Sequence, residues 1–282
     1  MRTTALHAAH RSLGAKLVEF GGWEMPISYP TGTIAEHLAC RNSAVVFDVS
    51  HLGTVRVEGP QAFAALQEVL SNDLRKIAPG KTQYTHLLDP DTADVLDDII
   101  VWWVAENVFD VMPNASNTQR VVQYLGGIDT TQTRCVVAVQ GPHARQAMSN
   151  VSQAASEVAR NQVQTIEILG STCVVAGTGY TGEDGFELFL NQGQAAALWD
   201  ALLQVGVLPA GLGARDTLRI EAGYNLYGQD MSLTTKPIDC GLSWTVDLQV
   251  NRSFVGAQAL RCSNQQRALL GLVLLDKGVL RA

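Results

Sequence analysis

The sequence predicts an α+β protein in which antiparallel sheets are flanked by helices. β-branched and aromatic residues dominate the run 95–103, which predicts a strand, and we expect it to pair with a strand over 81–88 across the turn at Asp89-Pro90. Apolar residues at helical spacing predict helices over 60–70 and 194–205. Because helices and paired antiparallel strands are mixed along one chain, the α+β class follows.

The same patterns place the other elements in chain order. Helices are also expected at 3–15, 33–42, from the 113–117 turn to about 125, after 140–142, and at 214–222, where Gly223 ends the last one. Further strands are expected at 45–51, 54–59, 108–112, 135–139, 186–190 and 242–248, with a hairpin joining 166–169 to 173–176. Phe20 to Pro26 combines a glycine turn with aromatic and thioether groups, which pack in a core or line an apolar slot; the core is the preferred interpretation.

Composition narrows the class of protein. The 282 residues can form one large domain or two to three smaller ones, and 46% hydrophobic residues suffice for a substantial core. A formal net charge of -7 argues against nucleic-acid binding, but a few local arginines can still bind a small anion. We expect neither a secretory signal nor a membrane span, because no apolar run is long enough.

The cysteines and histidines favour neither disulfides nor a metal. The five cysteines are scattered and form no CxxC pair, so we expect free, mostly buried thiols in a reducing cytoplasm. The six histidines show no HxH or HExxH spacing, so no metal site is expected. His51 lies at a strand end without a partner by spacing.

Two adjacent carboxylates open the strand that we expect to organise the protein. Both faces of 95–103 are mostly apolar, so this strand is predicted to be buried. Asp97 and Asp98 then point to opposite faces, and at most one of them faces a given pocket. A carboxylate beside an apolar cavity is costly unless it is paired or used, although a solvated turn end is the simpler alternative.

Three further features could form a ligand site. Three glycines in 179–185 permit close backbone approach, and Glu187 follows in a strand, where it could bind a planar amidine-like edge such as an aminopyrimidinone. Arg215 opens a helix, where the helix dipole disfavours a cation, so it is a candidate for binding a carbonyl or carboxylate. Arg219 could pair with Asp216 or Glu187 instead.

The third feature is Asn114 at a strand end, which suits a heterocycle edge but more often caps a helix or turn. A glycine-rich hairpin with a surface acid is likewise the simpler interpretation of the Glu187 stretch. The residues alone therefore predict a pocket with acids, an arginine and aromatic walls, and they do not name its ligand.

These same stretches resemble the T-protein family of the glycine cleavage system, the aminomethyltransferases. The resemblance runs through the chain in several separated motifs: Phe20-Gly-Gly-Trp-Glu-Met-Pro26, Phe47-Asp-Val-Ser-His51, Asn72-Asp73, Val95-Leu-Asp-Asp-Ile-Ile-Val101, Asn114-Ala-Ser-Asn117, Gln140-Gly-Pro142, Gly179-Tyr-Thr-Gly-Glu-Asp-Gly-Phe-Glu187, Gly211-Leu-Gly-Ala-Arg-Asp-Thr-Leu-Arg219, Glu221-Ala-Gly223, Leu226-Tyr-Gly228 and Lys277-Gly-Val-Leu-Arg281. Each motif is weak alone; together, in this order and spacing, they are specific.

The resemblance implies an activity, a substrate and a partner. The family takes the aminomethyl group from the lipoyl arm of H-protein, releases ammonia and transfers the one-carbon unit to tetrahydrofolate, giving 5,10-methylenetetrahydrofolate. By resemblance, Asp97 is the catalytic aspartate beside N5 of the folate. Glu187 binds the pterin, Arg215 contacts the substrate, and Asn114 and Tyr84 line the folate channel. A cytoplasmic location is expected, with neither nucleic acid nor membrane as a partner.

The resemblance also implies a multi-domain folate-binding fold. We expect one domain from 1–50 plus 135–225, a second from 51–134 plus 226–265, and the start of a C-terminal β domain in 266–282. The family continues into that β domain, so the sequence is expected to be a truncated or shortened form.

Two other readings remain open. Another tetrahydrofolate-dependent methyltransferase or demethylase on the same scaffold is one, although the motifs around Glu187 and Arg215 favour the T-protein. A non-enzymatic folate-binding accessory protein for iron–sulfur assembly is the other. The stretch 252–260 lacks the cysteine that such proteins carry, which argues against it.

Overall fold

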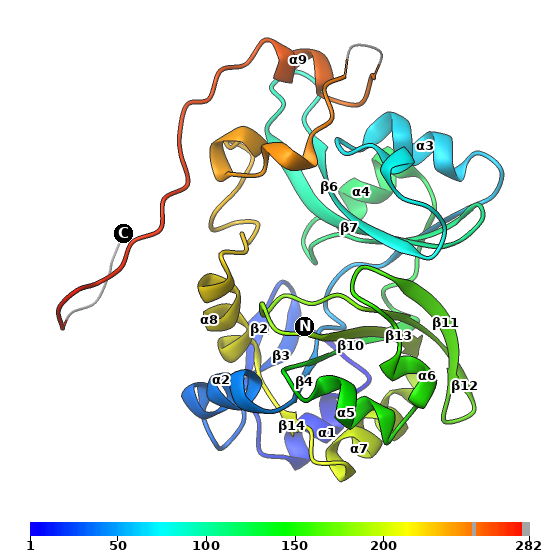
Figure 1. Cartoon of the computed structure of the whole chain (residues 1–282), viewed down its shortest axis with the longest axis vertical. Coiled ribbons are helices and arrows are strands. Elements are labelled where there is room, and N and C mark those ends of the chain that lie inside the picture. Colours follow the sequence, from blue (N-terminus) through cyan, green and yellow to red (C-terminus); the bar gives the residue numbers. More distant parts are fainter. Residues whose placement is uncertain (250–251, 278–282) are drawn as a thin grey trace.

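The computed structural model describes residues 1–249 and 252–277. Figure 1 shows two parts, an upper one containing α3, α4, β6 and β7, and a lower one containing β4, β10–β13 and helices α1, α2 and α5–α8. The described residues contain no helix long and apolar enough to cross a membrane. Helices and mainly antiparallel sheets are combined, so the predicted α+β class is confirmed.

The larger sheet has six strands in the order β11-β12-β13-β10-β4-β14. These strands are β4 (Val45–Asp48), β10 (Arg134–Gln140), β11 (Val163–Ile168), β12 (Ser171–Ala176), β13 (Gly185–Asn191) and β14 (Leu208–Pro209). All pairs are antiparallel except β14 with β4. The predicted hairpin of β11 and β12 is confirmed, but its turn is shorter than expected, because β12 already begins at Ser171.

Helices cover both faces of this sheet because its strands are apolar on both sides. The helices involved are α2 (Thr33–Asn42), α5 (Ala144–Ser149), α7 (Ala195–Gln204) and α8 (Leu212–Ala222). Val137 and Val139 of β10 pack with α5 and α7, whereas Val136 and Ala138 pack with α2 and α8. Because successive side chains of β10 point to opposite faces of the sheet, α5 and α7 cover one face and α2 and α8 cover the other. As predicted, α8 ends at Gly223, which is left-handed at φ 73°.

The second sheet has five strands in the order β6-β7-β8-β5-β9. They are β5 (Val55–Glu58), β6 (Lys81–Leu88), β7 (Val95–Ala105), β8 (Val108–Met112) and β9 (Ile128–Asp129), accompanied by α3 (Ala62–Val69) and α4 (Thr118–Leu125). β6 and β7 pair antiparallel as predicted. Trp102 of β7 is fully buried and stacks on Phe189 of β13, with ring centroids 4.2 Å apart, so it joins the two sheets.

The N-terminal residues differ from the prediction. The expected helix over 3–15 shrinks to α1 (His7–Ser12), and a three-stranded sheet forms from β1 (Arg2–Thr3), β2 (Lys16–Phe20) and β3 (Trp23–Ser28). Gly21 and Gly22 both have positive φ and close the β2–β3 turn. Trp23 and Met25 are buried core residues as preferred, whereas Phe20 is 39% exposed.

The strand predicted over 242–248 is wrong, because residues Ser243–Thr245 form a 3-10 helix. The Thr245 hydroxyl donates to the Leu242 carbonyl at 2.7 Å, and such a local bond competes with strand pairing. The other short helices are α6 (Gln153–Ser156), α9 (Ala257–Arg261) and the 3-10 helices Leu74–Lys76, Gln192–Gln194 and Pro237–Cys240.

The predicted domain division stays a prediction, although sheet membership is compatible with it. The strands of the five-stranded sheet lie within residues 55–129. The strands of the three-stranded sheet lie within residues 2–28, and those of the six-stranded sheet lie within residues 45–48 and 134–209. Residues 266–277 form no strand of the expected β domain, and 278–282 lie outside the described residues. All five cysteines are described: each is free and all but Cys262 are buried, as predicted.

Candidate active site

A cavity of about 800 Å³ lies where the two larger sheets and α8 face one another. Most of its wall area is apolar, and most of its polar groups come from four separate stretches of chain; His51, Arg145, Arg160 and Asn161 lie outside them. These stretches are β6–β7 with Tyr84 and Asp98, the loop 112–115, the stretch 177–187, and 212–229 with Arg215. Such a cavity with a few converging polar groups is the usual form of a small-molecule site.

The carboxylates of β7 point to opposite sides, as predicted, and Asp98 is the one that lines the cavity. Asp97 is fully buried and is not part of the cavity wall. The pleat decides this, because Tyr84 and Asp98 lie on the face of the β6–β7 pair that the cavity meets. The resemblance implies that Asp97 lies beside the ligand, whereas in the structure its neighbour Asp98 lines the cavity; the catalytic role of Asp97 stays a prediction.

Asn114 holds the two carboxylates together. Its Nδ2 lies 2.8 Å from Asp97 Oδ1 and 2.6 Å from Asp98 Oδ1, and its backbone N–H donates to Asp97 Oδ2 at 3.1 Å. Asn117 Nδ2 donates to Asp97 Oδ1 at 2.8 Å, and the Tyr84 hydroxyl donates to Asp98 Oδ2 at 2.8 Å. Asp97 therefore receives only N–H donors, whereas Asp98 keeps a side open to the cavity.

Burial raises the pKa of both carboxyl groups above the ordinary aspartate value. For Asp97 the negative charge of Asp98 raises the pKa further, while the amide donors of Asn117 and Asn114 lower it in part. For Asp98 the Tyr84 hydroxyl and Asn114 oppose the effect of burial. Two adjacent carboxyls of this kind titrate as a pair, so Asp98 is suited to exchanging a proton with a ligand.

Glu187 and Arg215 form the other polar pole of the cavity. Glu187 is buried on β13, where its Oε2 accepts from the Thr178 hydroxyl at 2.7 Å and its Oε1 lies 3.7 Å from Arg215 Nη2. Arg215 lies over the ring of Tyr180, 5.0 Å from its centroid, and burial lowers its pKa. Its Nη1 is buried without a partner among the described residues, so donor capacity is left for a ligand.

Arg219 is the structural arginine of this helix. Its guanidinium pairs with Asp216 at 2.9 Å and with Asp230, and it does not reach Glu187. The alternative pairing of Arg219 with Glu187 is therefore absent, and Arg215 fills that place. Both arginines lie on α8 one turn apart, and only the packing against β13 separates their roles.

Sequence reasoning missed several wall residues. Thr178 and Tyr180 border the Glu187 pole, and Trp244 lies beside Tyr84 with ring centroids 5.9 Å apart. His51 also lines the cavity, although its spacing along the chain predicted no partner for it. The glycine motif that contains Tyr180 was the one available signal for the first two; nothing local marks Trp244.

Comparisons with known proteins identify the family of this chain. The GCVT N-terminal domain model matches residues 6–250. Aminomethyltransferases from Nitrosomonas europaea and Cupriavidus metallidurans are 44% and 45% identical over the whole of this chain, which spans 80% and 81% of their lengths. The crystal structure of glycine cleavage system aminomethyltransferase T from Bartonella henselae superposes with a TM-score of 0.85 at 37% identity, covering 92% of this chain and 74% of that one. The chain therefore belongs to the aminomethyltransferase family of the glycine cleavage system, the T-proteins, and is an enzyme of that family.

Proposed function

We propose that this enzyme transfers the one-carbon unit of an aminomethyl-lipoyl group, carried by H-protein, to tetrahydrofolate. Ammonia leaves, and 5,10-methylenetetrahydrofolate is formed. The observation that carries the proposal is one cavity with a carboxylate–guanidinium pair at one pole and, at the other, the Asp98 carboxylate, whose pKa burial raises. Family membership supports the same reaction.

The pole at Glu187 fits the edge of the pterin. An aminopyrimidinone presents adjacent N–H donors beside a carbonyl acceptor. Glu187 Oε1 has no hydrogen bond shorter than the 3.7 Å contact to Arg215, so it can accept from the pterin N–H groups. The buried, unpartnered Arg215 Nη1 can donate to the carbonyl. Aromatic residues such as Tyr180 supply the apolar wall that a flat ring needs.

The pole at Asp98 fits the reacting nitrogen. As the carbon–nitrogen bond to the leaving ammonia breaks, N5 forms a bond to the methylene carbon and must lose its proton. We assign that proton to the Asp98 carboxylate, which Tyr84 and Asn114 orient. N10 then forms the second bond to the methylene carbon, the carbon–sulfur bond breaks, and the proton lost by N10 passes to the sulfur, which returns the dihydrolipoyl thiol. Asp97, expected to be the catalytic residue, is proposed to position Asn114 instead.

A narrow, largely apolar cavity favours this transfer over hydrolysis. Such a cavity can hold the two reactants in contact and limit the water around the methylene carbon. We place the reaction in the cytoplasm, where the four buried cysteines and the exposed Cys262 would stay reduced.

Two measurements test the function. Anaerobic calorimetric titration with tetrahydrofolate should give one-to-one binding, and Glu187→Gln should weaken it. An assay with aminomethyl-loaded H-protein should then show ammonia and 5,10-methylenetetrahydrofolate formed in equal amounts. A well-folded protein that binds no tetrahydrofolate would contradict the proposal.

A further inference from the structure

The side-chain amide of Asn117 is held between two partners that fix its orientation. Its Nδ2 donates to Asp97 Oδ1 at 2.8 Å, and its Oδ1 accepts from Arg120 Nη1 at 3.1 Å. An arginine has only donors and an ionised aspartate has only acceptors, so the amide can satisfy both partners in one orientation alone. The proposed reaction involves Asp97 but gives Arg120 no part.

The position of Asn117 in the fold would normally give its side chain a different contact. Asn117 is the N-cap residue of α4, where an asparagine usually accepts from a backbone N–H of the first helical turn. Here the side chain makes no such cap bond. It is buried and directed to Asp97 instead. A residue that gives up its usual local contact is a candidate for another task.

The Arg120 guanidinium is anchored at the start of β7. Its Nη1 also donates to the carbonyl of Leu96, the residue before Asp97, at 2.9 Å. The Arg120 side chain is partly buried and does not belong to the wall of the main cavity. Its bonds therefore lead to Asp97 through the Asn117 amide and the β7 backbone, and they do not lead to a ligand.

Asp97 has a second protonation state that this arrangement disfavours. Burial and the charge of Asp98 raise the pKa of Asp97, so its protonated form competes with the carboxylate. A protonated Asp97 could donate to an amide oxygen, and an Asn117 amide that was free to turn could accept from it. The backbone N–H of Asn114 cannot turn, and it needs an acceptor at Asp97 Oδ2. Because Arg120 holds the Asn117 oxygen away from Asp97, it favours the acceptor state.

Asn114 connects this buried arrangement to the cavity. Its Nδ2 lies 2.8 Å from Asp97 Oδ1 and 2.6 Å from Asp98 Oδ1. Asp98 lines the cavity, and its carboxylate is the proposed base. A change at Asp97 that moves Asn114 would therefore move the Asp98 carboxylate relative to a bound ligand.

We propose that Arg120 is a positioning residue of this enzyme, which acts by fixing the Asn117 amide against Asp97. This assignment rests on the proposed function. Through Asp97 the arrangement extends to Asn114, which orients the Asp98 carboxylate. Since Arg120 lies outside the cavity wall, its removal should lower turnover and leave tetrahydrofolate binding intact.

A double-mutant cycle between Arg120 and Asn117 tests this route. Arg120→Met keeps an unbranched stem and removes the N–H donors. We expect it to lower kcat with aminomethyl H-protein about tenfold, because a slightly misplaced base slows the transfer. The tetrahydrofolate Kd, measured by anaerobic calorimetry, should not change. Asn117→Ala should lower kcat by a similar factor, and the double variant should lose no more than either single variant.

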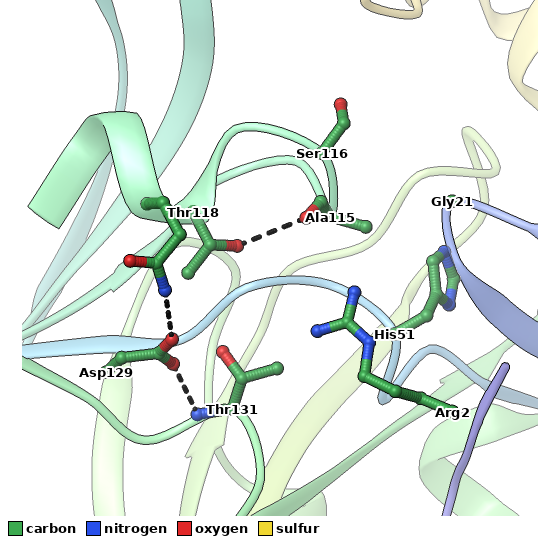
Figure 2. Close-up of a pocket in the computed structure, with 9 residues that line it drawn as sticks. Arg2, Gly21, His51, Ala115, Ser116, Thr118, Asp129 and Thr131 are labelled. Carbon is green, nitrogen blue, oxygen red and sulfur yellow. Dashed lines mark hydrogen bonds between the residues drawn. The ribbon is translucent and has the colours of Figure 1, made fainter.

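Two further variants are the controls. Arg120→Lys keeps N–H donors that can reach the Asn117 oxygen, so it should restore most of the turnover. Gln119 precedes Arg120 on α4 but lines a smaller cavity of about 210 Å³, which Figure 2 shows. The Gln119 amide donates to Asp129 at 3.2 Å and not to the carboxylate pair, so Gln119→Ala should leave kcat and tetrahydrofolate affinity unchanged.

Three results would overturn the assignment. A normal kcat in Arg120→Met would show that Arg120 does not position the base. Losses that multiply in the double variant, to about a hundredfold, would mean that Arg120 acts by a route other than Asn117. A matching loss of tetrahydrofolate affinity without rescue by lysine would reveal a general structural effect.

Thermal unfolding of each variant confirms that it is folded. If Arg120→Met does not fold, Arg120→Gln, which is shorter but polar, gives the same cycle with the same expected outcomes. Wild-type protein without turnover would refute the proposed function and this assignment together. Normal wild-type turnover with an unimpaired Arg120→Met would refute the assignment alone.

Discussion

Exchanging each aspartate of β7 for asparagine should separate the roles of the two carboxylates. In Asp98→Asn the new amide can keep both contacts: its oxygen accepts from Asn114, and its NH2 donates to the Tyr84 oxygen, which reverses its role. The fold should therefore be preserved. The loss of a general base should lower kcat by about 10²–10⁴-fold, or roughly 3–5 kcal/mol of barrier, with tetrahydrofolate affinity nearly unchanged.

Asp97→Asn should show the opposite pattern. All three partners of Asp97 are N–H donors, and one of them is the backbone of Asn114, which cannot reverse. The new NH2 must face a donor in a fully buried site, which costs about 1–3 kcal/mol of stability. Each kcal/mol corresponds to a Tm lower by about 2–4 °C in a protein of this size. Turnover should fall less than in Asp98→Asn.

Three measurements on both variants test these roles: steady-state kinetics with aminomethyl H-protein, calorimetric titration with tetrahydrofolate, and thermal unfolding. Because the pKa of Asp98 is raised, wild-type turnover should decline on acidification while the pH is still above the ordinary aspartate range, as the base becomes protonated. Near-normal turnover in Asp98→Asn, with an inactive but stable Asp97→Asn, would refute this reasoning and return the catalytic role to Asp97.

Three further predictions concern binding, packing and pH. Glu187→Gln should weaken tetrahydrofolate binding by about 10–100-fold, because charged hydrogen bonds to the pterin are lost beside Arg215; unchanged affinity in the titration would place the pterin elsewhere. Trp102→Ala removes the fully buried ring stacked on Phe189 and should cost about 3–5 kcal/mol in urea unfolding, whereas a cost under 1 kcal/mol would mean that the sheets are held elsewhere. Burial lowers the pKa of His86 from 6.5 to about 3, so the unfolded chain binds a proton that the folded chain rejects. Stability should fall as the pH drops from about 6.5 towards 3, by up to about 1.4 kcal/mol per pH unit from this group, and His86→Gln should flatten that slope. A wild-type slope that survives the exchange would exclude His86 as its source.

Local patterns predicted most elements because they report local physical preferences. The hairpin of β6 and β7 and the helix ended by Gly223 follow from alternation and from glycine's left-handed freedom. The prediction from local patterns was wrong where pairing between distant residues determined the secondary structure. The strands β2 and β3 have two glycines between them and a proline within β3. They form because pairing within the three-stranded sheet and the packing of Met25 in the core stabilise them. Residues Ser243–Thr245 form a 3-10 helix instead of a strand because a local hydrogen bond, from the Thr245 hydroxyl to the Leu242 carbonyl, competes with strand pairing.

The candidate site was predicted as a set of residues rather than as a geometry. Tyr84, Asn114, Glu187 and Arg215 were singled out from the sequence, and the structure brings them to one cavity. Their roles in binding and turnover stay predictions until the variants are measured. The register of β7 against its neighbours, which sets which aspartate faces the ligand, depends on the whole sheet.

The sequence by itself determined the fold class, the family and the residue types of the site, because motifs and periodicity are properties of neighbouring residues. Tertiary structure alone decided that Asp98 rather than Asp97 meets the cavity and that Arg215 rather than Arg219 lies next to Glu187. Each of these depends on which faces of distant strands and helices pack together, and no spacing along the chain encodes that contact.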